Sequence, residues 1–175
     1  MKIRLPSLRL DLSRLGVAGR VDHLRNRLVR APYFRGHGVH SPYIYSIVRE
    51  VFMRKYLMDG TRDLYAELLR RGIAEKRAVQ LQNLAIHCHY ASFSMDGGEG
   101  ELVVLTECVS REEVLRAVSH AEIARQTVVV MNPYADAERD ALCCELIARH
   151  ACTTVDNRAY LVIFNNHLPK QHFRI

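Results

Sequence analysis

The stretch LVVLTECVSREEVLRAVSHAEIARQTVVVM, residues 102–131, carries the clearest fold signal in the sequence. Its two uninterrupted apolar runs, 102–106 and 127–131, are typical of strands that are buried on both faces of a sheet. Between them, Ser110 and Glu113 have the spacing of a capping box, in which the serine accepts a backbone N–H and the glutamate reaches back. A strand, a helix and a second strand of these lengths predict a parallel α/β sheet.

The same alternation extends in both directions from this stretch. Ser41 followed by Pro42 predicts a helix start, because serine can accept a free N–H and proline at the first helical position loses no donor. A second helix is expected after Thr61, with Leu64, Leu68 and Leu69 on its buried face. We expect, in chain order, a helix at 42–56, a strand at 77–81, a helix at 84–93, a turn at 95–101, a helix at 135–150, and strands at 153–156 and 160–164. The final strand pair is where such a sheet can become antiparallel.

The charge of the chain is concentrated at its N-terminus. The formal net charge is +6 over 175 residues, and 49% of the residues are hydrophobic, which is enough for one domain with a core. Residues 1–30 contain eight Lys and Arg against Asp11 and Asp22, whereas residues 31–175 contain 17 Lys and Arg and 17 Asp and Glu. We therefore divide the chain into a basic arm, residues 1–34, and an α/β domain, residues 35–175.

The basic arm has a leucine repeat, Leu5, Leu8, Leu12 and Leu15, with the spacing of one helix face. Such a helix is most simply explained by packing on its own domain. An anionic membrane surface and a nucleic acid are alternative partners for residues 1–30. Aromatic side chains, which would stack on bases, are missing from residues 1–30.

The motif RGHGVHSPY, residues 35–43, contains the strongest polar candidates for a site. A catalytic role for His37 and His40 would need a nearby carboxylate or nucleophile, and the local sequence has none. We therefore interpret the motif as structural: a loop, a cap and the helix that seats the arm on the domain. The residues of this motif, or possible site, are Arg35, His37, His40, Ser41 and Tyr43.

Metal and phosphate sites are not indicated. HCHY, residues 87–90, lacks a second pair of ligands at the spacing of a zinc site. DGGEG, residues 96–100, precedes a strand and not a helix, so a turn is favoured over a phosphate-binding loop. The five cysteines are an odd number without framework spacing, and no apolar signal segment precedes the domain, so we expect reduced thiols and a cytoplasmic location.

The segment RGHGVHSPYIYSIV, residues 35–48, resembles the N-terminal part of a bacterial group of class I S-adenosylmethionine-dependent methyltransferase-like proteins. ELVVLTECVSREEVLRAV resembles their fourth strand and following helix, TVVVMNPYADAERDAL their fifth, and TTVDNRAYLVIFNNHLPKQHFRI their closing hairpin and tail. The resemblance implies a shortened Rossmann-like, mostly parallel sheet with flanking helices and an N-terminal helical arm.

This chain departs from the family where the family holds its methyl donor. The counterpart of the family's E-I-G-T-x-x-G turn is 80–86, which begins with Gln80 and has Gln82 and Ile86 in place of glycines, whose backbone the cofactor approaches. Thr106 stands where the resemblance implies an aspartate, and Asn132 follows the next strand. The vestigial cofactor pocket is expected to include Gln80, Gln82, Thr106, Glu107 and Asn132.

These departures lead us to expect a pseudoenzyme without a cofactor and without catalytic residues, acting as a scaffold or interaction module. A second copy of the chain, or another protein, is the expected partner, because a shortened sheet exposes its edges. Two alternatives stay open. The chain can be a methyltransferase or nucleoside-binding protein with an altered pocket, or a module whose basic arm binds nucleic acid or an anionic membrane.

Overall fold

A computed structural model of the chain describes residues 39–175. The basic arm, Arg35 and His37 lie outside the described residues, and so do the expectations that concern them.

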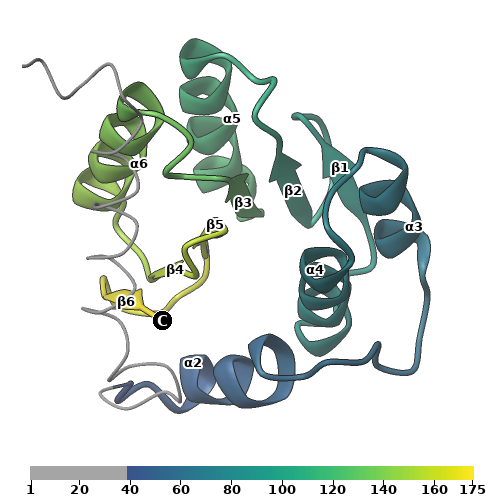
Figure 1. Cartoon of the computed structure of the whole chain (residues 1–175). Coiled ribbons are helices and arrows are strands. Elements are labelled where there is room, and N and C mark those ends of the chain that lie inside the picture. The colour runs from purple at the N-terminus through teal and green to yellow at the C-terminus, as the bar shows by residue number, and fades with distance from the viewer. Residues whose placement is uncertain (1–38) are drawn as a thin grey trace, which may run out of the picture.

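The described chain alternates helices and strands, as Figure 1 shows. Three helical segments precede the first strand: α2 (Pro42–Ile47), which continues as the π-helix η3 (Val48–Phe52), then α3 (Asp63–Arg70) and α4 (Glu75–His87). The remaining elements are β1 (Phe93–Met95), β2 (Leu102–Leu105), α5 (Arg111–Ala124), β3 (Thr127–Met131), α6 (Ala137–Arg149), β4 (Thr154–Asp156), β5 (Tyr160–Ile163) and β6 (His172–Arg174).

The six strands form one mixed sheet in the order β1-β2-β3-β5-β4-β6. β1 pairs with β2, β2 with β3, and β4 with β6, all in parallel. Only β5 runs the other way, inserted between β3 and β4. The fold is therefore α/β with a mostly parallel sheet, as predicted, and the final strand pair is antiparallel, also as predicted.

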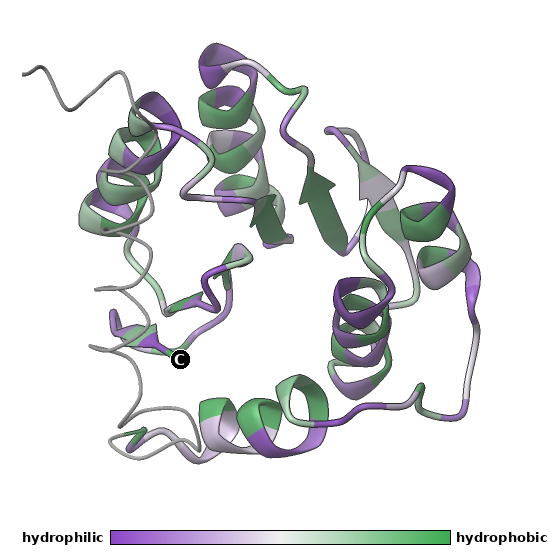
Figure 2. Ribbon diagram, in the orientation of Figure 1, coloured by the Kyte–Doolittle hydropathy of each residue, from purple (hydrophilic) through white to green (hydrophobic). Residues whose placement is uncertain are grey.

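Helices cover both faces of the sheet and make two apolar cores. One core lies between the sheet and α2, η3, α3 and α4, and includes the buried side chains of Leu102, Val104 and Val129. The other lies between the sheet and α5 and α6, and includes Val103 and Val128. The alternation along β2 and β3 sends neighbouring residues to opposite cores. Figure 2 shows the resulting hydrophobic inner surfaces of the helices and their hydrophilic outer surfaces.

Four elements differ from the sequence prediction. Residues 77–81 are part of helix α4 and not a strand, and the helix expected at 84–93 is the second half of the same helix. Phe93 instead begins strand β1, and strand β6 was not predicted. Leu69, expected on the buried face of α3, is 39% exposed, while Leu64 and Leu68 are buried as predicted. The other predicted elements are confirmed within two residues at each end, except that the helix starting at Pro42 changes to π-helix at Val48 and ends at Phe52.

Within residues 39–175, no helix has the length and apolar composition needed to cross a membrane.

Candidate functional site: the carboxyl edge of the sheet

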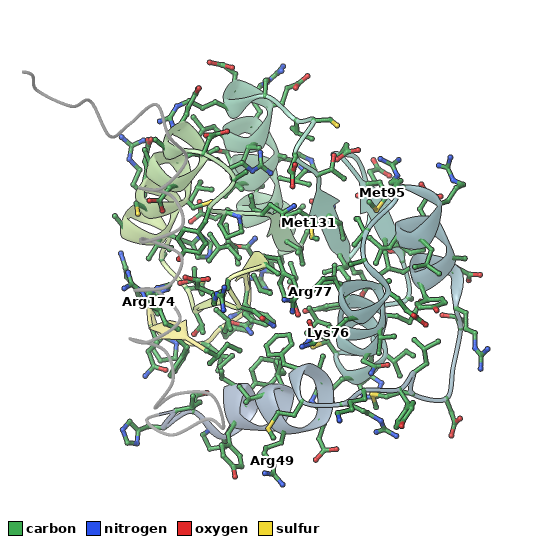
Figure 3. The ribbon with its side chains drawn as sticks, in the orientation of Figure 1. Arg49, Lys76, Arg77, Met95, Met131 and Arg174 are labelled. Carbon is green, nitrogen blue, oxygen red and sulfur yellow. The ribbon has the colours of Figure 1, made fainter. Side chains whose placement is uncertain are left out.

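The carboxyl ends of β1, β2 and β3 form one edge of the sheet, which is where open α/β sheets bind their ligands. The residues that follow these strands are Asp96, Thr106 with Glu107, and Asn132. Figure 3 labels Met95 and Met131, which end β1 and β3 and mark this edge. The predicted pocket residues Thr106, Glu107 and Asn132 therefore do lie on a common edge.

Asp96 is the acidic residue at the end of β1, and both of its carboxylate oxygens have partners within the chain. One oxygen accepts a hydrogen bond from the Thr106 backbone N–H at 2.8 Å, and the other contacts the Arg71 guanidinium. Arg71 is also ion-paired with Glu67 at 2.6 Å. Asp96 thus joins β1 to β2 and to helix α3. Sequence reasoning missed this residue; the signal was an acid placed directly before two glycines.

Arg139 is a buried arginine, 7% exposed, at the edge between β2 and β3. Asp136 caps helix α6 by accepting the Arg139 N–H at 2.8 Å, which fixes the arginine in the first turn of the helix. Its guanidinium donates to the Met131 carbonyl at 3.0 and 3.1 Å and to the Thr106 carbonyl at 2.9 Å. The chain's own cation therefore satisfies the carbonyl groups at the ends of both strands.

Asn132 and Glu107 contact each other across the same edge through their side chains. Asn132 has a φ of 46°, a left-handed conformation that asparagine tolerates better than most residues, and its N–H donates to the Ala159 carbonyl at 2.8 Å. The turn that leaves β3 is thereby tied to the start of β5. The side chains of Asp96, Glu107 and Asn132, which follow these strands, are thus all engaged with other groups of the chain.

Gln80 and Gln82 do not lie on a cofactor turn, which corrects their predicted position. Both are buried on helix α4. Gln80 donates to the Phe52 carbonyl at 2.7 Å and accepts from the Tyr160 hydroxyl at 3.2 Å, while Gln82 accepts from the Tyr65 N–H at 2.9 Å. The two glutamine side chains thus serve as hydrogen-bond partners for backbone groups of η3 and α3. Their role is to hold helix α4 against these two segments.

The connection from β1 to β2, residues 96–101, is the glycine-rich stretch that the sequence assigned to a turn. It follows a strand, as a nucleotide-binding loop does, but it leads directly to β2 and not to a helix. A Cβ on Gly100 would lie 2.7 Å from the Phe93 carbonyl carbon, so this connection folds back against β1 itself. No helix N-terminus follows Asp96 to offer free N–H groups to a phosphate or carboxylate.

Because β1 lies at the edge of the described sheet, the ligand-binding crevice of doubly wound sheets has strands on one side only. In doubly wound sheets a dinucleotide lies where the strand order reverses, with strands on both sides of the first strand. Within residues 39–175, β1 is an edge strand and the order β1-β2-β3 proceeds in one direction without reversal. The residues present therefore do not fit an S-adenosylmethionine site of the usual kind.

A small pocket of about 200 Å³ lies farther along the sheet, between α6 and the ends of β4, β5 and β6. Its polar lining includes Tyr134, Asp140 and Asp156, and Cys143 and Cys144 line it from α6. Burial raises the pKa of Cys143 to about 12, so this thiol is protonated at neutral pH. The volume is below the range of about 300–1,000 Å³ found for ligand pockets, which argues against a nucleoside-sized occupant.

The described part of the opening motif has structural contacts. Ser41 caps α2 by accepting the Ile44 N–H at 3.4 Å, as predicted. The Tyr43 ring packs edge-on against Phe164 with centroids 5.8 Å apart, and its hydroxyl lies 3.4 Å from the Cys88 sulfur. Burial is the main cause that raises the pKa of the Tyr43 phenol. His40 is exposed.

The HCHY segment ends helix α4 and continues into the turn beyond it. His87 lies 3.2 Å from the Ser46 hydroxyl, which itself donates to the Tyr43 carbonyl at 2.8 Å. Among residues 39–175, no three His, Cys, Asp or Glu side chains gather in a way that could hold a metal ion.

Comparison of the chain with protein-family models, with curated proteins and with solved structures found no match.

Proposed function

We propose that this chain is a shortened, methyltransferase-like α/β domain that does not bind S-adenosylmethionine and that works as a scaffold or interaction module. The observation that carries the proposal is the use of the carboxyl edge by the chain itself. Arg139 occupies the ends of β2 and β3, and Asp96 is held by Arg71 and the Thr106 N–H. A cofactor would have to displace these internal bonds and leave a buried guanidinium without acceptors.

Two further features support the same proposal. The acid at the end of β1 precedes a connection without a helix, and the position aligned with the family's glycine turn is a buried helix, α4. The antiparallel insertion of β5 is compatible with the closing hairpin that the resemblance implies. The scaffold around the edge is thus compatible with the family, whereas the chemistry expected at the edge does not fit the residues present.

Isothermal titration of the purified full chain with S-adenosylmethionine and S-adenosylhomocysteine tests the proposal directly. We expect no heat of binding and no thermal shift, even at about millimolar ligand, at which a weak site of about −4 kcal/mol would half-saturate. Binding at micromolar affinity would contradict the proposal and restore the altered-pocket alternative. In that case Asp96→Asn and Arg139→Met would identify the groups that move to admit the ligand.

A second copy of the chain is the partner we propose for this domain. β1 and β6 are the two edge strands of the described sheet, and an edge strand offers unpaired backbone groups to another strand. Size-exclusion chromatography with light scattering should give twice the chain mass of 20.1 kDa. A mass of one chain at micromolar concentrations would leave another protein as the partner.

A further inference from the structure

Alternate residues of β1 and its flanks form the hydrogen bonds to β2. The Asp96 N–H donates to the Val104 carbonyl at 2.8 Å, and the Leu102 N–H donates to the Ser92 carbonyl at 3.2 Å. Backbone groups point to opposite sides of a strand at successive residues, so Ser94, between these two positions, also directs its N–H and C=O groups toward β2. The inner edge of β1 is therefore used by the sheet.

The other two residues of β1, Phe93 and Met95, direct their N–H and C=O groups to the outer edge of the strand. β1 is the first strand in the sheet order, so no other strand of the described chain pairs with this edge. Both residues are half-buried, and within residues 39–175 their backbone groups make no hydrogen bond on this side. Helix α3 reaches the end of β1 through Arg71, whose contact is with Asp96, one residue beyond the strand. The outer edge is thus open to a partner.

β1 also lacks the residues that keep an unpaired edge strand apart from other strands. Natural edge strands are commonly protected by a charged side chain or a proline. The sequence of β1 is Phe-Ser-Met, which contains neither. The charge that follows it, on Asp96, is neutralised by an ion pair with Arg71. β1 is therefore suited to pairing with a further strand.

Ser94, at the centre of β1, has a buried hydroxyl that lacks a partner within the described chain. Its Oγ is covered from solvent and makes no hydrogen bond with any group of residues 39–175. The glycine-rich connection lies over it, since a Cβ on Gly98 would be 3.8 Å from the Ser94 Cβ. Buried hydroxyls are rarely left without a partner, because their desolvation is then not compensated. A second strand at the outer edge would supply one.

A second copy of β1, placed antiparallel with Ser94 opposite Ser94, satisfies all of these groups at once. In this register Phe93 lies opposite Met95 of the partner subunit, and each of the two such pairs exchanges two backbone hydrogen bonds. Ser94 and the partner's Ser94 form the closely spaced pair between them, in which two hydroxyls can bond to each other. The arrangement has a two-fold axis through the serine pair, as the common homodimers do.

The same register also matches the side chains on the other face of the strand. Phe93 and Met95 both pack against the core that lies beneath α4, so they point to the same face of the sheet. Opposite residues of antiparallel strands share a face, which brings each aromatic ring against a thioether of the partner. At the flanks Ser92 lies opposite Asp96, so no like charges face each other across the pair.

We propose that two copies of the chain pair antiparallel through the outer edges of β1, centred on Ser94, and continue one sheet across both subunits. The inference rests on the second-copy partner proposed above and names the edge that forms the interface. The alternative edge, β6, contains the exposed Arg174, and a cation on an edge strand disfavours pairing with another strand.

Amide hydrogen exchange of the full chain, followed by NMR, tests the register without any substitution. We expect the Phe93 and Met95 amides to exchange about tenfold more slowly, or slower still, as the protein concentration is raised, because the bonds between subunits then cover them. The Asp96 amide is the internal control, since it is bonded to Val104 within the chain and should not change. Exchange at Phe93 and Met95 that is independent of concentration would overturn the proposal.

Met95→Pro tests the interface by substitution. Proline removes an N–H donor from the outer edge and places its ring there, and edge strands accept proline at such positions. Association should weaken about tenfold or more, and light scattering should move toward the mass of one chain, 20.1 kDa.

The matched control is Arg174→Pro on β6. The Ile175 N–H donates to the Asp156 carbonyl, so the N–H of the preceding Arg174 faces the outer edge of β6. This variant should remain a dimer, and circular dichroism should show that both proline variants are folded.

The outcomes separate this proposal from the one on which it rests. A dimer that survives Met95→Pro but dissociates with Arg174→Pro would place the interface on β6, and a dimer that survives both would place it on another surface. Either result overturns the pairing through β1 and keeps the second copy as partner. A single-chain mass for the unmodified protein at every concentration would reject the second copy as well. If Met95→Pro does not fold, the exchange of the Phe93 and Met95 amides decides the question.

Discussion

Two connections join the parallel strands β1, β2 and β3, and only one of them contains a helix. From β2 to β3 the chain passes through helix α5, which packs Val114, Val118 and Ala121 against the sheet. From β1 to β2 it passes through residues 96–101 alone, with three glycines and no helix. A parallel connection normally needs a dozen residues or more. The connection from β1 to β2 can be shorter because β1 has only three residues. Glycine also lets the backbone of this connection fold back against β1.

This difference affects what the carboxyl edge of the sheet can bind. A helix between two parallel strands covers the sheet and also directs its N-terminal N–H groups toward the carboxyl edge. The glycine connection provides neither, and the chain fills the edge with Asp96, Arg71 and Arg139 instead. We therefore expect the glycine connection to tolerate changes poorly and the helical connection to tolerate them well.

The largest effect is expected from Gly100→Ala. The added Cβ would lie 2.7 Å from the Phe93 carbonyl carbon and 2.8 Å from the Ser94 nitrogen, so the backbone of β1 must move. We expect the free energy of unfolding to fall by about 3 kcal/mol or more. Urea denaturation followed by circular dichroism measures this loss.

Gly97→Ala is the matched control in the same connection. Gly97 has a φ of 110° and nothing lies within 4 Å of its added Cβ, so the substitution introduces backbone strain without a collision. Its cost should be about 1 kcal/mol. Equal losses for the two variants would show that strain, and not contact with β1, limits this connection.

The next largest effect is expected in helix α6, which follows β3, from Arg139→Met. Methionine leaves the Thr106 and Met131 carbonyls without the guanidinium that now serves both, and we expect a loss of about 2 kcal/mol. Arg149→Met, at the exposed end of the same helix, should change stability by less than about 0.5 kcal/mol. If the two substitutions cost the same, the buried guanidinium does not hold the edge.

A smaller effect is expected inside the helical connection, from Ser110→Ala. The Ser110 hydroxyl accepts the Glu113 N–H at 3.4 Å, and Glu113 reaches back to the Ser110 N–H at 3.0 Å. Loss of this cap should cost about 1 kcal/mol, with α5 still formed because its apolar face is unchanged. Ser119→Ala, at an exposed position of α5, should cost far less in the same denaturation experiment.

The smallest effect concerns the ion pairs that anchor the start of the glycine connection. Hydrogen bonds from Arg70 and then Arg71 lower the pKa of Glu67 from 4.5 to about 2. The ionised carboxylate therefore stabilises the fold above pH about 4.5, and this contribution is lost as the pH falls toward 2. Side-chain NMR titration should place the Glu67 midpoint near pH 2, and Arg70→Met should raise it. A midpoint near 4.5 in the unmodified chain would mean that the carboxylate is not paired in solution.

Local signals in the sequence predicted the part of the fold that surrounds the helical connection. The apolar runs predicted the buried strands β2 and β3, and the capping box predicted the start of helix α5. The structure confirms all three elements. The first half of helix α4 was missed because its buried Gln80, Gln82 and Asn83 find their partners in η3, α3 and the turn between them. Those partners lie 17 to 28 residues away in sequence, beyond what a local pattern reports.

The site was predicted in part for the same reason. Thr106, Glu107 and Asn132 follow recognisable strands, so their common edge could be inferred. Asp96 could not be placed there, because β1 is a strand only through its pairing with β2. The role of Arg139 could not be predicted from the sequence. Most arginines in helices are exposed, and the local sequence does not show that this one is buried.

The π-helix η3 has a consequence for insertions and deletions. The Met53 N–H bonds to the Val48 carbonyl, five residues back, so this turn contains one residue more than an α-helical turn. Deleting one residue from 48–52 would restore regular winding and keep most of the hydrogen bonds. The residues before and after the deletion would keep nearly their present orientation, because the π-turn accommodates its extra residue within a single turn. Ile44 and Phe52 would then still face the same core. An additional residue in the same turn would instead rotate the two parts by about 100° relative to each other, so homologues should tolerate a one-residue deletion here more readily than an insertion.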